Sequence, residues 1–162
     1  MLLMKNRYHI MPSAQLLACQ PIPVVRIALI GLGNRGMKTL ERYQYIKNAE
    51  ICCLVDIDKQ RLDEANAKLT ATGRPLARAM QGAEAWKEAC QLADIDLVYI
   101  CTEWRWHTVI AVEAMNCGKH VAVEVPAATW HADEPGITFC LSLGSLPKEY
   151  INLAKELTKN IS

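Results

Sequence analysis

The chain has 162 residues, of which 51% are hydrophobic and 22% are charged, and its formal net charge is +1. This composition is ordinary for a globular protein, and the length suffices for one domain with a sizeable core. Because the charges form no basic or acidic block, the sequence offers no support for nucleic-acid binding. No apolar run approaches the roughly 20 residues of a transmembrane helix, so we expect no membrane partner.

The seven cysteines include no C-x-x-C pair. An odd number of cysteines without metal-ligand spacing is typical of a reducing compartment, and it argues against a disulfide scaffold or a zinc site. We therefore expect a cytoplasmic protein with no bound metal.

Residues 1–23 predict a flexible leader ahead of the first strand. The run Leu-Leu-Ala-Cys at 16–19 follows two basic residues and resembles the processing site of an exported lipoprotein. Polar residues and Pro12 interrupt the apolar core that an export signal needs. We favour a leader or an upstream start codon, with export as the minor alternative.

Residues 24–30 form an apolar run rich in β-branched side chains, which predicts a buried strand. Gly31, Gly33 and Gly36 follow in G-x-G-x-x-G spacing, and apolar residues at helical spacing continue from there to Ile46. In such a motif the first glycine allows a tight turn, the second lets a pyrophosphate approach the backbone, and the third lets the helix pack close to the sheet. The free N–H groups at the helix start then hold the phosphate anion.

Asp56 ends the next predicted strand, residues 49–56, and stands 20 residues after Gly36. A carboxylate at this place accepts hydrogen bonds from the adenosine ribose and repels a 2′-phosphate. Ile57 supplies no counter-charge, so we expect NAD rather than NADP as the cofactor. Strand, glycine motif, helix and acid together predict a dinucleotide-binding βαβ unit, and a glycine-rich loop without a ligand is the alternative.

The following segments continue the alternation of helices and strands. Asp58 is placed to cap a helix that Gly73 ends. A short strand is expected within residues 75–80, and residues 82–90 predict a short helix in which Trp86 packs against the core.

Two further apolar runs, residues 95–102 and 120–125, predict strands that flank a helix over residues 107–118. The resulting pattern predicts an α/β fold, namely a Rossmann-type doubly wound parallel sheet. Ligands bind off the carboxyl ends of such strands, which selects the glycine loop, residues 102–107 and residues 124–126.

The motifs IGLGNRG, VDID, CTEWRWH and EVP agree in type, order and spacing with one known family. The chain resembles the N-terminal domain of the Gfo/Idh/MocA family (glucose–fructose oxidoreductase, inositol dehydrogenase and relatives) over about residues 24–129. The resemblance implies an NAD-binding Rossmann domain. In the family, a separate α+β substrate domain normally follows it.

One departure from the family pattern points to a particular branch. Dehydrogenases of the family carry E-K-P where this chain has Glu124, Val125 and Pro126. The family lysine orients the sugar and passes a proton, and valine can do neither. The combination of GLGNRG, WRWH and EVPAA looks like the NAD-dependent glycosidases of the family, whose activity is α-N-acetylgalactosaminidase.

The resemblance also implies which residues contact the cofactor. Beyond the motif glycines Gly31, Gly33 and Gly36, these are Asn34, Arg35, Asp56, Trp104, Arg105, Trp106, His107, Glu124 and Val125. Alternatives stay open for several of them: Arg35 points to solvent, Trp104 and Trp106 pack the cleft, and His107 satisfies backbone groups at a helix start. Glu103 is expected to be a solvated loop acid rather than a catalyst. No catalytic base or acid is assigned.

In that branch, NAD⁺ oxidises the sugar C3 hydroxyl to a ketone, which acidifies the proton on C2. The glycosidic oxygen leaves by elimination, water adds, and the hydride is returned, so the pair of carboxylates used by most glycosidases is not needed.

The resemblance fades after residue 129, and residues 130–162 predict an atypical tail with a strand and an amphipathic helix. This tail either covers the sheet edge or is a frame-shifted or recombined end. In both cases we expect a single domain without the substrate domain, which binds NAD and meets a sugar substrate only if that domain is supplied. The alternatives are a fragment of a sugar or polyol oxidoreductase and a non-catalytic nucleotide-binding module, and an oligomer is possible in each.

Overall fold

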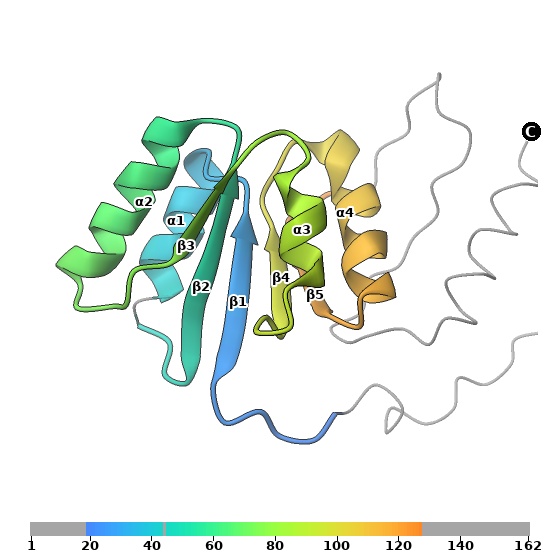
Figure 1. Cartoon of the computed structure of the whole chain (residues 1–162), viewed down its shortest axis with the longest axis horizontal. Coiled ribbons are helices and arrows are strands. Elements are labelled where there is room, and N and C mark those ends of the chain that lie inside the picture. The colour runs from blue at the N-terminus through green and yellow to red at the C-terminus, as the bar shows by residue number, and fades with distance from the viewer. Residues whose placement is uncertain (1–18, 44, 128–162) are drawn as a thin grey trace, which may run out of the picture.

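The structure is a computed structural model that describes residues 19–43 and 45–127. The expectations for residues 1–18 and for the tail lie outside these residues. Strands and helices alternate along the described part of the chain (Figure 1). The elements are β1 (Val25–Ile30), α1 (Asn34–Tyr43), β2 (Ala49–Asp56), α2 (Lys59–Ala71), β3 (Arg78–Gln81), α3 (Ala85–Gln91), β4 (Leu97–Ile100), α4 (Trp104–Asn116) and β5 (His120–Val123).

The five strands form one parallel sheet in the order β3-β2-β1-β4-β5. Helices α1 and α2 pack on one face of this sheet, and α3 and α4 pack on the other (Figure 1). This is the doubly wound order, in which the chain leaves β1 toward one edge and later returns to build the other. The predicted Rossmann-type fold is therefore confirmed.

Strand β1 shows why the sheet has two cores. Its side chains alternate between the faces, so Ala28 and Ile30 join the core under α3 and α4, whereas Ile27 and Leu29 join the core under α1 and α2. All four are at most 2% exposed. A central strand of a covered parallel sheet must be apolar on both faces, which explains the unbroken apolar run.

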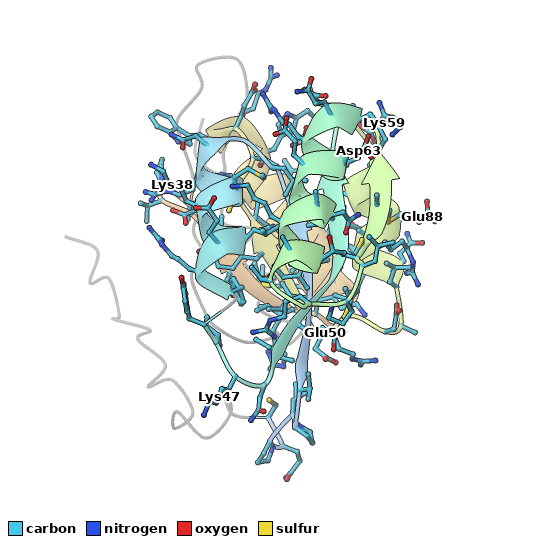
Figure 2. The ribbon with its side chains drawn as sticks, turned by 90° about the vertical axis from the view of Figure 1, so that its left-hand side faces the viewer. Lys38, Lys47, Glu50, Lys59, Asp63 and Glu88 are labelled. Atoms are coloured by element: carbon cyan, nitrogen blue, oxygen red, sulfur yellow. The ribbon has the colours of Figure 1, made fainter. Side chains whose placement is uncertain are left out.

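Helix α2 forms as its sequence predicts. The Asp58 side chain accepts a hydrogen bond from the backbone N–H of Gln60 at 2.9 Å and so caps the helix start. Gly73 follows the helix end with a φ of 73°, a left-handed conformation that glycine adopts without steric cost. Charged side chains such as Lys59 and Asp63 cover its outer face (Figure 2).

Several predicted boundaries are wrong by a few residues. Helix α1 ends at Tyr43, and Ile46 lies beyond it, 44% exposed. Strand β3 begins at Arg78, inside the expected range of residues 75–80, and ends one residue beyond it at Gln81. Strands β4 and β5 are shorter than the apolar runs that contain them. Helix α4 begins at Trp104, directly after Glu103, which is still extended with a φ of −67° and a ψ of 147°.

The amino ends of the strands are joined by polar side chains. Asp96, just before β4, accepts hydrogen bonds from the backbone N–H, Nε and Nη2 of Arg26 at 2.7–2.9 Å. These bonds hold the pKa of the Asp96 carboxyl below its ordinary value, although partial burial acts against them. Lys119, 8% exposed, donates from Nζ to the carbonyl oxygens of Leu92 and Ile95 at 2.5 and 2.9 Å.

Candidate cofactor site

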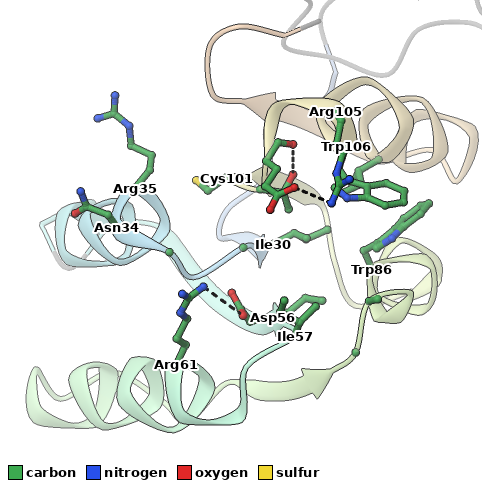
Figure 3. A pocket seen from close by; sticks show the side chains of 18 residues that line it. Ile30, Asn34, Arg35, Asp56, Ile57, Arg61, Trp86, Cys101, Arg105 and Trp106 are labelled. Atoms are coloured by element: carbon green, nitrogen blue, oxygen red, sulfur yellow. Dashed lines mark hydrogen bonds and ion pairs between the residues drawn. The ribbon is translucent and has the colours of Figure 1, made fainter. Parts of the chain in front are cut away.

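A cavity of about 460 Å³ lies at the carboxyl ends of β1, β2 and β4 (Figure 3). The glycine loop, the start of α1, the end of β2, the segment before α3 and the first turn of α4 all contribute to its wall. Its volume falls within the range of small-molecule sites, and its place is where open α/β sheets bind ligands.

The three motif glycines differ in what surrounds them. A Cβ at Gly31 would lie 2.8–2.9 Å from backbone atoms of Cys101 and Thr102, and its φ is 88°. A Cβ at Gly36 would lie 1.9 Å from the carbonyl oxygen of Gly31. A Cβ at Gly33 would meet no atom of the described residues within 4 Å. Gly31 and Gly36 therefore serve the packing of the loop, and the open space is at Gly33.

The start of α1 faces this open space. Asn34 and Arg35, the first residues of the helix, line the cavity together with Gly33 (Figure 3). The first N–H groups of a helix have no partner within the helix, and the helix dipole places partial positive charge there. The wall near Gly33 thus combines free space with backbone donors, as a pyrophosphate requires.

Asp56 connects the end of β2 to the glycine loop. It is 7% exposed, and its Oδ2 accepts a hydrogen bond from the N–H of Leu32 at 2.6 Å, while Oδ1 accepts one from the N–H of Asp58 at 2.9 Å. An ionised carboxylate offers about four lone-pair sites, so about two remain. The side chain lines the cavity, where these acceptors suit the two hydroxyl groups of a ribose.

Arg61 is a cavity residue that the sequence interpretation did not identify. Its Nη1 lies 3.9 Å from Oδ1 of Asp56, and its Nε lies 3.7 Å from Oδ2 of Asp58 (Figure 3). Ile57 supplies no charge, as expected, but α2 brings this guanidinium to the carboxylate from its first turn. The i,i+3 spacing from Asp58 to Arg61 on a capped helix was the signal available in the sequence.

Arg35 and Glu124 are brought together from distant parts of the chain. Nε of Arg35 lies 3.2 Å from Oε2 of Glu124, and the hydroxyl of Tyr99 donates to Oε1 at 3.1 Å. Burial first, and this bond to a carboxylate second, raise the pKa of Tyr99 to about 12. Glu124 lies outside the cavity wall and holds Arg35, whereas Val125 is 74% exposed.

The segment WRWH forms the first turn of α4 and not a loop before the helix. Arg105 and Trp106 line the cavity, and Arg105 pairs with Glu103 at 2.9 Å. The Trp106 ring packs against Trp86, with ring centroids 6.5 Å apart. Trp104 is 60% exposed and outside the wall.

His107 is buried and is not part of the cavity wall. The side chain is 1% exposed, with Nδ1 2.8 Å from the carbonyl oxygen of Pro126 and Nε2 3.0 Å from that of Thr102. Its ring therefore joins the segment after β4 to the segment after β5. This geometry fits the alternative that His107 satisfies backbone groups, and it departs from the expectation of a cofactor-lining side chain.

Trp86 and Cys101 complete the apolar side of the cavity. Trp86 belongs to the core, as predicted, but it also lines the cavity, and its Nε1 has no hydrogen-bond partner among the residues that the structure describes. Burial raises the pKa of the Cys101 thiol to about 12. Across residues 19–43 and 45–127, no three His, Cys, Asp or Glu side chains gather as a metal ion would require. None of the helices there has the length and apolar character to cross a lipid bilayer.

The fold and the cavity define a dinucleotide-binding Rossmann domain. A family model described as "Oxidoreductase family, NAD-binding Rossmann fold" matches residues 25–135, and the chain belongs to this family, Gfo/Idh/MocA. The domain is thus an NAD-binding one, as the glycine loop and Asp56 predict.

Two curated relatives share about half of their aligned sequence with the chain. It is 46% identical to glycosyl hydrolase family 109 protein 2 of Phocaeicola vulgatus over 75% of the chain and 30% of that relative. It is 50% identical to an alpha-N-acetylgalactosaminidase of Bacteroides fragilis over 69% of the chain and 26% of that relative. The chain therefore spans less than a third of either relative.

Among solved structures, the chain is similar to scyllo-inositol dehydrogenase from Lactobacillus casei with bound cofactor NAD(H) and scyllo-inositol. The TM-score is 0.56 at 25% identity, and the match covers 65% of the chain and 29% of the dehydrogenase.

Proposed function

We propose that this chain is the NAD-binding part of an NAD-dependent glycosidase that acts on α-N-acetylgalactosaminides. The observation that carries the proposal is the 50% identity to the Bacteroides fragilis enzyme, twice the 25% identity to the inositol dehydrogenase. Val125, which stands where the dehydrogenases of the family carry lysine, supports the same assignment.

Each part of the cavity would hold one part of the cofactor. The space at Gly33 and the N–H groups of α1 would bind the pyrophosphate. The remaining lone pairs of Asp56 would bind the adenosine ribose. When bound, NAD⁺ supplies a reversible hydride transfer to and from the sugar. The protein contributes binding and orientation at these positions.

The proton transfers of such a reaction need groups other than those at the β5 end of the site. Val125 carries no ionisable group, and both ring nitrogens of His107 face backbone carbonyls in the interior. We therefore propose that the sugar-binding and proton-transfer groups are residues other than Val125 and His107. In this assignment the described domain holds and orients the cofactor.

Calorimetric titration of the full chain with NAD⁺ tests the first part of the proposal. We expect saturable binding at or below millimolar NAD⁺. Absence of binding at that concentration contradicts the cofactor role.

A chimera tests the choice between glycosidase and dehydrogenase. In the chimera, residues 25–127 of this chain replace the corresponding domain of the Bacteroides fragilis enzyme. The chimeric protein is then assayed with NAD⁺ and nitrophenyl α-N-acetylgalactosaminide. A glycosidase domain yields nitrophenol without net NADH, because the hydride is returned. Net NADH from a sugar or polyol, with no nitrophenol release by a folded chimera that binds NAD⁺, points to the dehydrogenase alternative.

A further inference from the structure

The ribose end of the cavity carries two opposite charges and not one. The buried carboxylate of Asp56 and the guanidinium of Arg61 both line the wall, 3.9 Å apart at their nearest atoms (Figure 3). A phosphate on the 2′ position of the ribose would interact with these two charges in opposite ways. An acid there disfavours that phosphate, and a nearby arginine accommodates it.

Arg61 keeps its hydrogen-bonding capacity in this arrangement. Its distances of 3.9 Å to Asp56 and 3.7 Å to Asp58 are those of ion pairs and exceed a hydrogen bond. The side chain is 48% exposed, so it can reorient at the cavity mouth without unfolding α2. A guanidinium has five N–H donors in a planar fork, which matches a phosphate in a bidentate manner.

Asp56, by contrast, is fixed. Hydrogen bonds from Leu32 and Asp58 hold both of its oxygens, and the side chain is 5% exposed. A 2′-phosphate beside this buried carboxylate would bring like charges together where water screens them poorly. The attraction from Arg61 is already shared between two carboxylates, so the repulsion prevails and the ribose without the phosphate is preferred.

We propose that Asp56 and Arg61 form the selectivity pair of this site, in which Arg61 is a latent 2′-phosphate ligand held in check by Asp56. The assignment rests on the proposed NAD-binding role. It predicts that selectivity for NAD over NADP depends on the charge of Asp56, and that removal of this charge lets Arg61 bind the phosphate.

Titration of the full chain with NAD⁺ and with NADP⁺ tests the pair through binding alone. The variants are Asp56→Asn, Asp56→Ser, Arg61→Gln and the combinations of Arg61→Gln with each Asp56 change. Lys59→Gln is the matched control, since it removes the same charge from the same helix. Lys59 pairs with Asp63 on the outer face of α2, outside the cavity wall (Figure 2).

We expect the unaltered chain to bind NAD⁺ at least about tenfold more tightly than NADP⁺. Either Asp56 variant should lower NAD⁺ affinity and raise NADP⁺ affinity by about tenfold each, the effect of one charged contact. Adding Arg61→Gln to either Asp56 variant should abolish this gain in NADP⁺ affinity. Adding Lys59→Gln to the same variants should leave the gain unchanged. Thermal denaturation identifies any variant that fails to fold, and the serine and asparagine variants substitute for each other.

Three results would overturn the assignment while NAD⁺ binding stands. These are equal affinity of the unaltered chain for both cofactors, a gain in NADP⁺ affinity that survives Arg61→Gln, and an equal loss of that gain with Lys59→Gln. Failure of the unaltered chain to bind either cofactor would overturn the proposed function and this assignment with it.

Discussion

The two ends of the sheet use their charged side chains differently. At the amino ends of the strands, Arg26 forms hydrogen bonds with Asp96, and Lys119 donates to two carbonyl oxygens. At the carboxyl ends, Asp56 keeps about two lone pairs beside a cavity. Both ends contain buried or half-buried charges. At the amino end these charges are used within the protein and hold the strands together. At the carboxyl end, part of their hydrogen-bonding capacity remains available to a ligand.

The largest effect is expected at Gly36, where the carboxyl end is packed most closely. Gly36→Ala places a Cβ 1.9 Å from a backbone oxygen, which no side-chain movement can relieve. We expect a loss of about 3 kcal/mol or more of unfolding free energy, measured by urea denaturation. Unchanged stability would show that the glycine loop at Gly31 can move away from α1 at little energetic cost.

Gly33→Ala separates binding from folding. Within the described part of the chain the new Cβ meets no atom within 4 Å, so stability should stay within about 0.5 kcal/mol. The methyl group would occupy the space assigned to the pyrophosphate, and NAD⁺ affinity should fall by about ten- to a hundredfold in calorimetry. Full affinity in this variant would place the pyrophosphate elsewhere.

Lys119→Met, at the amino ends of the strands, should lower stability without changing NAD⁺ affinity. It removes the Nζ donor from two carbonyl oxygens: that of Leu92 keeps the backbone N–H of Ile95 at 3.3 Å, whereas that of Ile95 loses its side-chain donor in a buried place, which should cost about 2 kcal/mol of stability. NAD⁺ affinity of the folded protein should not change. Lys87→Met is the control, because it removes the same charge from an exposed side chain. An equal loss in the control would mean that the carbonyl contacts contribute little.

The smallest effect is expected from Asp96 and depends on pH. Its carboxyl has a lowered pKa in the folded state, so its stabilisation is fully present above the unfolded pKa, near 4, and is lost as pH falls through the folded value. Asp96→Asn should therefore lower Tm by a few degrees at neutral pH. The difference from the unaltered chain should shrink as pH falls below about 4. A difference that is constant with pH would exclude the charge as its cause.

Local patterns were enough to predict the fold and the centre of the site. The apolar runs predicted β1 and β2, Asp58 capped its helix as expected, and Asp56 lies at the edge of the cavity. Each of these depends on neighbours along the chain or on the rule that parallel strands end at a common edge.

The features of the site that the sequence did not predict depend on tertiary contacts. The pairing of Arg35 with Glu124 joins residues far apart in the chain, and the burial of His107 depends on the path of the segment after β5. Polar and aromatic residues alternate in WRWH, so the pattern does not separate the cavity-lining Trp106 from the exposed Trp104. Arg61 is the exception, because its i,i+3 spacing from Asp58 is visible in the sequence.

The burial of the cysteines has a practical consequence for chemical labelling. Burial raises the pKa of Cys53, Cys90 and Cys101 to about 12, so at neutral pH they remain thiols, and it is the thiolate that attacks an electrophile. Cys19 is exposed and precedes β1, and the chain enters β1 at the amino ends of the strands, whereas the cavity lies at their carboxyl ends (Figure 1). A maleimide dye should therefore modify Cys19 well before the three buried thiols, and a dye there would leave the mouth of the cavity unobstructed.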